Sequence, residues 1–244
     1  MELRSVWNRG VLELSDEELN FLKSRLDENG IRISSIGSPI GKVDIKDDFE
    51  NSLEKFKRAV AIALKMGTKN IRIFSFYIPR DEMDTYEPEV IRRMSILAKT
   101  AQINDLTVFH ENEAGIFGET SDRCLKLFET VCDPNFKMVF DPSNFVAAGE
   151  DVYNMSFKRL KKHIAYLHIK DSLKSTGQIV IAGKGDGCIR EILDELKDRE
   201  GMFVSLEPHL DYAGQYRGFS GLELFLKDLK AFRTILNDLN IQVV

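Results

Sequence analysis

The stretch NIRIFSFY, residues 70–77, is the clearest strand signal in this sequence. In an extended chain, Ile71 and Ile73 point to one side, while Phe74 and Phe76 point to the other. A strand that is apolar on both sides is typical of a parallel sheet whose two faces are covered. This stretch therefore predicts a buried parallel strand, and we look for its neighbours on either side.

Similar β-rich runs recur before and after this stretch, each separated from the next by a segment with helical periodicity. They cover residues 31–36, 106–113, 137–141, 164–170 and 202–207, with residues 1–4 as a shorter stub. One intervening helix is expected to begin at the capping box that Ser15 opens, because the side chains of Ser and Glu satisfy free backbone donors there. Strand–helix alternation of this kind indicates right-handed βαβ units and an α/β fold with a parallel sheet.

The choice between an open sheet and a closed barrel depends on glycine motifs. An open sheet that binds dinucleotides would carry G-x-G-x-x-G after its first strand, and this sequence has none there. The loop GKGDG, residues 183–187, lacks the Ser or Thr of a phosphate-binding Walker loop, so it either approaches a phosphate in another way or forms a tight turn. We therefore expect a (β/α) TIM-type barrel. No Pro/Gly/Ser-rich linker divides the chain, which predicts a single domain over residues 1–244.

The strand count is one short of a complete barrel. Seven strands are expected, including the stub, whereas a closed barrel of this type has eight. The predicted consequence is a gap beside the first and last strands. The tail at residues 241–244 or a partner subunit in a homo-oligomer could close it, or it stays open and impairs the site.

Composition bounds the class of protein. The 244 residues are 43% hydrophobic and 30% charged, which suits a globular chain with a sizeable core. The net charge of −5 opposes binding to nucleic acid or to an anionic membrane. The three cysteines form no C-x-x-C pair, no apolar run approaches membrane-spanning length, and the N-terminus lacks signal-peptide organisation. We expect a soluble cytoplasmic protein.

Four ionisable residues close four successive predicted strands. They are Glu111, Asp141, His168 and Glu207, and each is separated from the next by about one strand and one helix. Chemistry in a parallel barrel sits at the C-terminal ends of the strands, where inward-pointing side chains converge. Taken singly, such a carboxylate is more often a loop cap, and such a histidine a structural residue. Four in register favour a shared site.

Three carboxylates and an imidazole in one place would repel each other unless a cation neutralised them. An oxygen-rich ligand set with one nitrogen suits a divalent ion such as manganese, magnesium or cobalt, with zinc as an alternative. The sequence therefore predicts one divalent metal ion as cofactor, with manganese first.

The strand-end motifs carry a family resemblance. The stretches HENEAGIFGET (110–120), FDPSN (140–144), YLHIKD (166–171) and SLEPH (205–209) resemble the xylose isomerase-like TIM barrel superfamily, and within it the sugar phosphate isomerase/epimerase family. The resemblance extends to ISSIGSPIGK (33–42) and AGKGDG (182–187). It implies an incomplete barrel, because the strand and helix with which the family begins, ahead of the segment like residues 1–4, are missing from this sequence. It implies a metal site made of the same four residues and a small sugar as substrate. It also implies that Glu111 and Glu207 are the catalytic acid/base pair, which moves a proton through an enediolate.

Four further residues are candidates for substrate binding. Lys170 lies two residues after His168 and shares its strand face, so it could hold a substrate oxygen or extend from the strand end to solvent. Asn144 stands where related ketose epimerases have a histidine, which puts the usual ketose substrate in doubt. Glu113 could contact a hydroxyl or cap its loop, and Arg217 could bind an anionic group or stay solvated.

We therefore predict a metal-dependent isomerase or epimerase of a small sugar or sugar derivative. A sugar- or metal-binding barrel without turnover is the first alternative. The second is an abasic-site endonuclease on the same barrel, but those relatives hold three zinc ions and need many histidines. This chain has four, and its negative charge opposes DNA binding.

Overall fold

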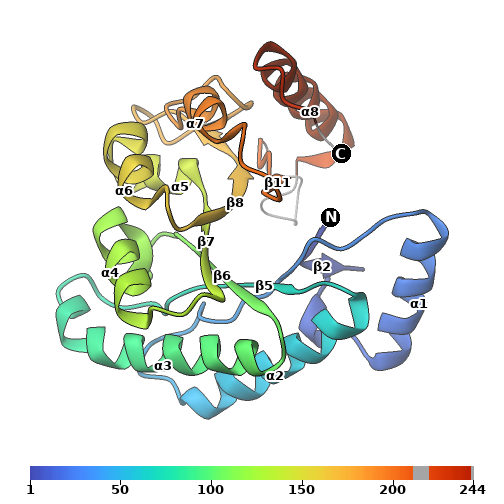
Figure 1. The fold of residues 1–244 in the computed structure, drawn as a ribbon, viewed down its shortest axis with the longest axis vertical. Coiled ribbons are helices and arrows are strands. Elements are labelled where there is room, and N and C mark those ends of the chain that lie inside the picture. The colour runs from blue at the N-terminus through green and yellow to red at the C-terminus, as the bar shows by residue number, and fades with distance from the viewer. Residues whose placement is uncertain (211–219, 243–244) are drawn as a thin grey trace. The chain divides into compact units, whose positions relative to one another are not determined.

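A computed structural model (Figure 1) describes residues 1–210 and 220–242. Within these residues, the main sheet contains seven strands. In spatial order these are β1 (Glu2–Leu3), β4 (Ser35–Gly37), β5 (Asn70–Ile73), β6 (Thr107–Glu111), β7 (Phe136–Phe140), β8 (Ile164–Ile169) and β11 (Phe203–Leu206). The pairs β1–β4, β4–β5, β5–β6, β6–β7 and β8–β11 are all parallel. The predicted α/β fold with helices between parallel strands is confirmed, and so is the count of seven within the described residues.

Helices follow the strands along the chain. The α-helices are α1 (Asp16–Glu28), α2 (Phe49–Met66), α3 (Met83–Ile103), α4 (Ser121–Val131), α5 (Pro142–Ala147), α6 (Lys158–Leu160), α7 (Ile189–Leu196) and α8 (Gly221–Asp238). Two short hairpins pair β2 (Ser5–Val6) with β3 (Arg9–Gly10) and β9 (Asp171–Ser172) with β10 (Ile179–Val180). Among the described residues, no helix combines the length and apolar character needed to cross a membrane.

The chain divides into two compact units. The first contains residues 1–111, 115–118 and 126–139, and the second contains residues 112–114, 119–125 and 140–244. The boundary falls at the end of β6 and near the end of β7.

The first unit holds α1, α2 and α3, and its local signals match its helices. The predicted capping box of α1 is present: the Glu18 amide donates to Ser15 Oγ at 3.2 Å, and the Ser15 amide donates to Glu18 Oε2 at 2.7 Å. Helix α2 ends at Gly67, whose φ of 73° lies in the left-handed region that glycine tolerates.

The stretch that predicted the fold is shorter as a strand than expected. Strand β5 stops at Ile73, and the chain then bends through Phe76, which has a φ of 70°. The amides of Phe74 and Phe76 bond to the carbonyls of Ile40 and Gly41 instead of a strand neighbour. A Cβ on Gly41 would lie 2.0 Å from the Phe74 carbonyl oxygen, so only glycine fits this crossing.

The second unit contains a helix that the sequence did not predict. Helix α5 begins immediately after β7, with Pro142 in its first turn and Asp141 as its N-cap. A π-helical turn, Val152–Phe157, leads into α6. Residues 241 and 242 form no strand, and the rest of the tail lies outside the described residues.

Candidate metal centre

Asp141 lies at the junction between β7 and α5. Its Oδ1 atom accepts a hydrogen bond from the Asn144 amide at 3.0 Å, which caps the helix. Its Oδ2 atom lies 2.6 Å from Nζ of Lys170. The carboxylate is fully buried, so it needs a positive charge nearby.

His168 and Glu207 come from the adjacent parallel strands β8 and β11. The register pairs His168 with Ser205, so Glu207 lies one step beyond the end of β11 on the same side. The Glu207 amide donates to the Ile169 carbonyl at 3.0 Å, which fixes the chain there. His168 Nδ1 lies 3.7 Å from Glu207 Oε2, and His168 is fully buried.

Glu111 is the last residue of β6 and the last residue of the first unit's main segment. Its Oε2 atom accepts a hydrogen bond from Nη1 of Arg72 at 2.7 Å, and its side chain is buried. The next residue, Asn112, makes two hydrogen bonds with the backbone of Asp141, both at 3.0 Å. Its side-chain Nδ2 donates to the Asp141 carbonyl, and its Oδ1 accepts from the Asp141 backbone amide.

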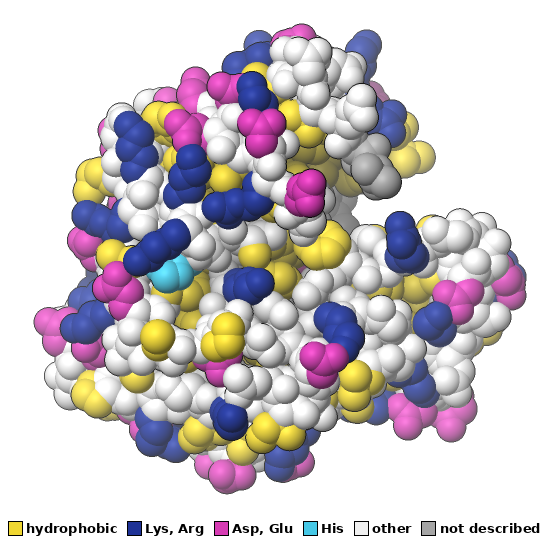
Figure 2. All heavy atoms as spheres, viewed as in Figure 1, with side chains coloured by type: hydrophobic (Ala, Val, Ile, Leu, Met, Phe, Trp, Pro, Cys, Tyr) yellow, Lys and Arg dark blue, Asp and Glu magenta, His cyan; other side chains and the backbone are white. Residues whose placement is uncertain are grey.

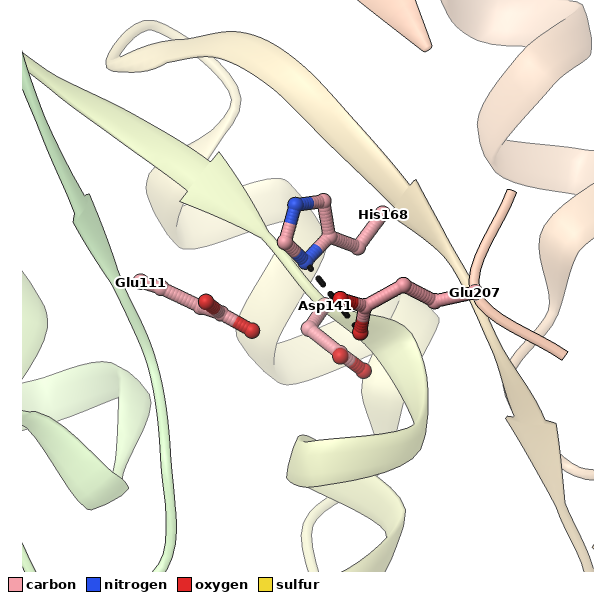
Figure 3. Close-up of side chains that lie close together, drawn as sticks. All are labelled: Glu111, Asp141, His168 and Glu207. Carbon is pink, nitrogen blue, oxygen red and sulfur yellow. Dashed lines mark ion pairs between the residues drawn. The ribbon is translucent and has the colours of Figure 1, made fainter. Parts of the chain in front are cut away.

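The four predicted ligands form one cluster. Each of Glu111, Asp141, His168 and Glu207 offers a ligand atom, and these atoms all lie within 4.8 Å of one another (Figure 3). Three carboxylates at this separation, mostly buried, repel each other strongly unless cations balance them. The donor set, with three oxygens and one nitrogen, therefore fits a divalent ion.

Lys170 and Asn144 are also part of this arrangement. Lys170 Nζ donates to Asn144 Oδ1 at 2.9 Å, and the side-chain Nδ2 of Asn144 donates to the Asn112 backbone carbonyl at 2.8 Å. Lys170 is 8% exposed, so the alternative of a lysine reaching into solvent is wrong. Its ammonium instead lies between the Asp141 carboxylate and the Asn144 amide.

Two candidates for substrate binding remain. Glu113 caps its own loop, since Oε1 accepts from the Ala114 amide at 3.0 Å. Arg217 falls outside the described residues.

A pocket of about 590 Å³ lies within the second unit, next to Lys170 and Asn144. Its lining includes Lys174 and His209, with hydroxyl groups from Ser143 and Ser172. The pocket gives a small polar molecule room beside Lys170 and Asn144.

The glycine loop at residues 183–187 surrounds a side chain of the protein itself. The carboxylate of Asp171 accepts hydrogen bonds from the amides of Gly183, Gly185 and Gly187, each at 2.9 Å. A Cβ on Gly185 would lie 2.3 Å from Asp171 Oδ1, which explains a glycine there. Of the two readings of this loop, the tight turn is the one that the structure favours.

Sequence reasoning missed Arg72 and Glu2. Arg72 lies in β5, is 5% exposed, and contacts both Glu111 and Glu2. The available signal was a lone charged residue inside an otherwise apolar strand, because a buried arginine requires carboxylate partners.

His110, next to Glu111, faces the core of the first unit. Its Nε2 lies 2.9 Å from Ser75 Oγ, which also accepts a hydrogen bond from the Gly118 amide. Burial lowers the pKa of this imidazole to about 3, so it is neutral near pH 7. His110 is therefore a structural residue of the HENEAGIFGET motif.

The comparisons with known proteins agree with this architecture. A family model described as a xylose isomerase-like TIM barrel matches residues 1–241. A search of curated proteins finds no match. Many solved structures match. Eight of them are 15–20% identical to this chain, a level at which similarity shows the fold.

Three of these structures illustrate how the matching proteins are described. D-psicose 3-epimerase with D-tagatose from Clostridium cellulolyticum H10 is 16% identical, with a TM-score of 0.70 over 93% of this chain and 83% of that chain. The probable 3-DHS dehydratase AsbF from Bacillus anthracis is 19% identical, with a TM-score of 0.71 over 89% and 82%. A barrel protein from Mycobacterium smegmatis in complex with magnesium is 17% identical, with a TM-score of 0.69 over 94% and 81%.

Proposed function

Because the chain belongs to the xylose isomerase-like TIM barrel family, we propose that it is a divalent-metal-dependent isomerase or epimerase of a small sugar or sugar derivative. The observation that carries the proposal is the cluster of three carboxylates and one imidazole at the strand ends. The epimerases among the structural neighbours support a sugar as substrate.

Glu111, Asp141, His168 and Glu207 would hold the ion. The oxygen-rich donor set favours manganese or magnesium, and a structural neighbour is described with magnesium. A bound divalent ion would supply positive charge beside the two adjacent oxygens of an open-chain sugar, which favours loss of the proton from the neighbouring carbon.

Glu111 and Glu207 are the proposed proton carriers. Both carboxylates belong to the cluster, so a sugar carbon bound there could lose a proton to one and regain it from the other. Return of the proton to the opposite face of the same carbon gives an epimer. Return to the adjacent carbon interconverts an aldose and a ketose.

Lys170 and Asn144 are the proposed substrate contacts. The Lys170 ammonium and the Asn144 amide both border the pocket of the second unit, so they can donate hydrogen bonds to sugar hydroxyl groups there. An amide at position 144 is uncharged at every working pH, so it binds a hydroxyl without titrating. Glu113 remains a candidate for a substrate contact, and so does Arg217, which lies outside the described residues.

A small neutral or weakly charged substrate suits the surface better than a nucleic acid does. On the face shown in Figure 2, Lys and Arg side chains are interspersed with Asp and Glu. A nucleic-acid interface would instead present a stripe of basic side chains.

The test is proton exchange with solvent. Protein stripped with EDTA and reloaded with Mn²⁺ is incubated in D₂O with a panel of ketoses, and NMR follows the C3 and C1 protons. We expect metal-dependent exchange on at least one sugar. Glu207→Gln should abolish the exchange while circular dichroism stays unchanged, whereas the exposed Glu200→Gln should exchange as the wild type does.

Three other outcomes would redirect the proposal. Metal binding without exchange on any sugar would favour the binding protein without turnover. Loss of water from a substrate, without exchange into recovered sugar, would favour a lyase such as the probable dehydratase among the neighbours. Cleavage of abasic DNA would favour the nuclease.

A further inference from the structure

Arg72 is a buried cation between two buried carboxylates of the first unit. Its Nε atom lies 2.9 Å from Glu2 Oε1, and its Nη1 atom lies 2.7 Å from Glu111 Oε2. All three side chains are less than 10% exposed. Three strands, β1, β5 and β6, therefore contribute one residue each to a continuous array of charges.

The array is fixed by the strand register and by close packing. Glu2 pairs with Ser35, and Gly37 pairs with Arg72, so these residues share one side of the sheet. A Cβ on Gly37 would lie 2.7 Å from Glu2 Oε1 and 2.9 Å from Arg72 Nη2, so the glycine makes room for the ion pair. The ring of Phe74 lies 4.7 Å from the guanidinium carbon.

We propose that Arg72 is a positioning residue for Glu111, and that Glu2 is the counter-ion that allows a cation to sit there. This inference rests on the proposed function, because it assigns Glu111 to a metal site. The Arg72 guanidinium holds the Glu111 carboxylate in a fixed orientation by bonding one oxygen. Hydrogen bonds of this kind to metal-binding carboxylates set their orientation and their affinity for the ion.

Two opposing effects of Arg72 must be weighed. Its positive charge repels a metal ion, whereas its hydrogen bond holds the Glu111 ligand in place. Glu2 cancels most of the repulsion, because the Glu2–Arg72 pair carries no net charge. Without Arg72, two buried carboxylates would lose their shared partner and repel each other, so Glu111 would turn away. We therefore expect the net effect of Arg72 to be an increase in metal affinity.

The experiment measures Mn²⁺ affinity by calorimetric titration of EDTA-stripped, folded protein. We expect Arg72→Met to weaken binding about 10- to 100-fold. Arg72→Lys should recover part of the loss, because an ammonium can replace one of the two hydrogen bonds. Glu2→Gln should also weaken binding, since it leaves the cation uncompensated beside the site.

Arg93 offers a matched control in the same unit. It is also buried, with Nε 2.7 Å from Glu89 Oε1 and its guanidinium stacked on Phe49 and Phe76. Arg93→Met likewise removes a buried guanidinium, here one on α3 whose carboxylate partner Glu89 is 32% exposed. It should lower the denaturation midpoint and leave Mn²⁺ affinity unchanged.

A double-mutant cycle separates positioning from a general effect on stability. In the Glu111→Gln background, Arg72→Met should not weaken Mn²⁺ binding further, because the carboxylate that it positions is gone. The inference is overturned if Arg72→Met binds Mn²⁺ within twofold of the wild type, or if Arg93→Met loses as much. If Arg72→Met does not fold, Arg72→Lys and Glu2→Gln decide, and wild-type affinity in both overturns it. A wild type that binds no Mn²⁺ overturns the proposed function as well.

Discussion

The Nζ atom of Lys170 lies 2.6 Å from the Oδ2 atom of Asp141, and the two side chains are buried together in the second unit. The same carboxylate belongs to the candidate metal cluster. The Lys170 ammonium and a bound metal ion would therefore both neutralise the Asp141 carboxylate. The free energy of unfolding should then depend on whether the metal is bound.

Replacing Lys170 with Met should expose this linkage. In EDTA, the variant should lose about 3–5 kcal/mol of unfolding free energy, because removal of one partner leaves a buried carboxylate uncompensated. Saturating Mn²⁺ should restore part of that loss by supplying the missing charge. Urea unfolding in EDTA and in MnCl₂ measures both values.

Lys174 provides the control for this prediction. It is exposed, and its Nζ donates to the Gly149 carbonyl at 2.7 Å instead of to a carboxylate. Lys174→Met should change stability by no more than about 1 kcal/mol in either buffer. An equal loss for Lys170→Met with and without Mn²⁺ would show that the ammonium and the ion do not share Asp141.

The four ligand candidates could be found from the sequence because each one closes an apolar strand. The ends of parallel strands meet at one edge, so position along the strand predicts proximity. Arg72 could not be assigned in the same way. Its partners depend on the register of β1 against β4 and of β4 against β5, and the short strands of this region do not encode that register in their composition.

Two features of the fold were missed for local reasons. Asp141 was expected to end a strand, but it also caps α5, a six-residue helix too short to show hydrophobic periodicity. Phe76 was expected to continue a strand, but it adopts a left-handed φ where the chain crosses Gly41. In that position tertiary packing overrides the strand preference of phenylalanine.

The buried imidazole of His110 should make stability depend on pH. Its pKa of about 3 lies below the ordinary value of 6.5, so the unfolded chain binds a proton between these values and the folded chain does not. The unfolding free energy should therefore rise with pH through this window, by about 1.4 kcal/mol per unit from this group.

The variant His110→Gln isolates this contribution. It removes the titrating group, so the slope of unfolding free energy against pH between 4 and 6 should fall by about 1.4 kcal/mol per unit relative to the wild type. Urea titrations at half-unit intervals measure it. Parallel slopes for the two proteins would mean that the folded state protonates His110.

Asp171 should stabilise the loop at residues 183–187. Its carboxylate accepts from the amides of Ser172, Gly183, Gly185 and Gly187. Asp171→Asn would turn an NH₂ group toward some of these donors, and unsatisfied buried donors should cost about 1–3 kcal/mol. The exposed Asp198→Asn should cost no more than about 0.5 kcal/mol. Equal denaturation midpoints for the two variants would contradict this role.

Gly118 should be required for the packing of His110. A Cβ at this position would lie 2.3 Å from Cε1 of the imidazole. The ring cannot move away easily, because Phe128 and Phe136 pack against it with ring centroids 6.1 and 6.2 Å distant. Gly118→Ala should therefore lose about 1–3 kcal/mol through overpacking.

The effect of Gly118→Ala should also reach the candidate metal centre, because His110 is bonded directly to Glu111. Displacing the ring moves the backbone that carries this ligand, so Mn²⁺ affinity should fall together with stability. Gly10→Ala is the control: its Cβ would lie 3.4 Å from the flexible Glu13 carboxylate at an ordinary φ of −62°. That variant should keep wild-type stability to within about 0.5 kcal/mol and wild-type affinity. A destabilised Gly118→Ala that still binds Mn²⁺ normally would separate the packing of His110 from the placement of Glu111.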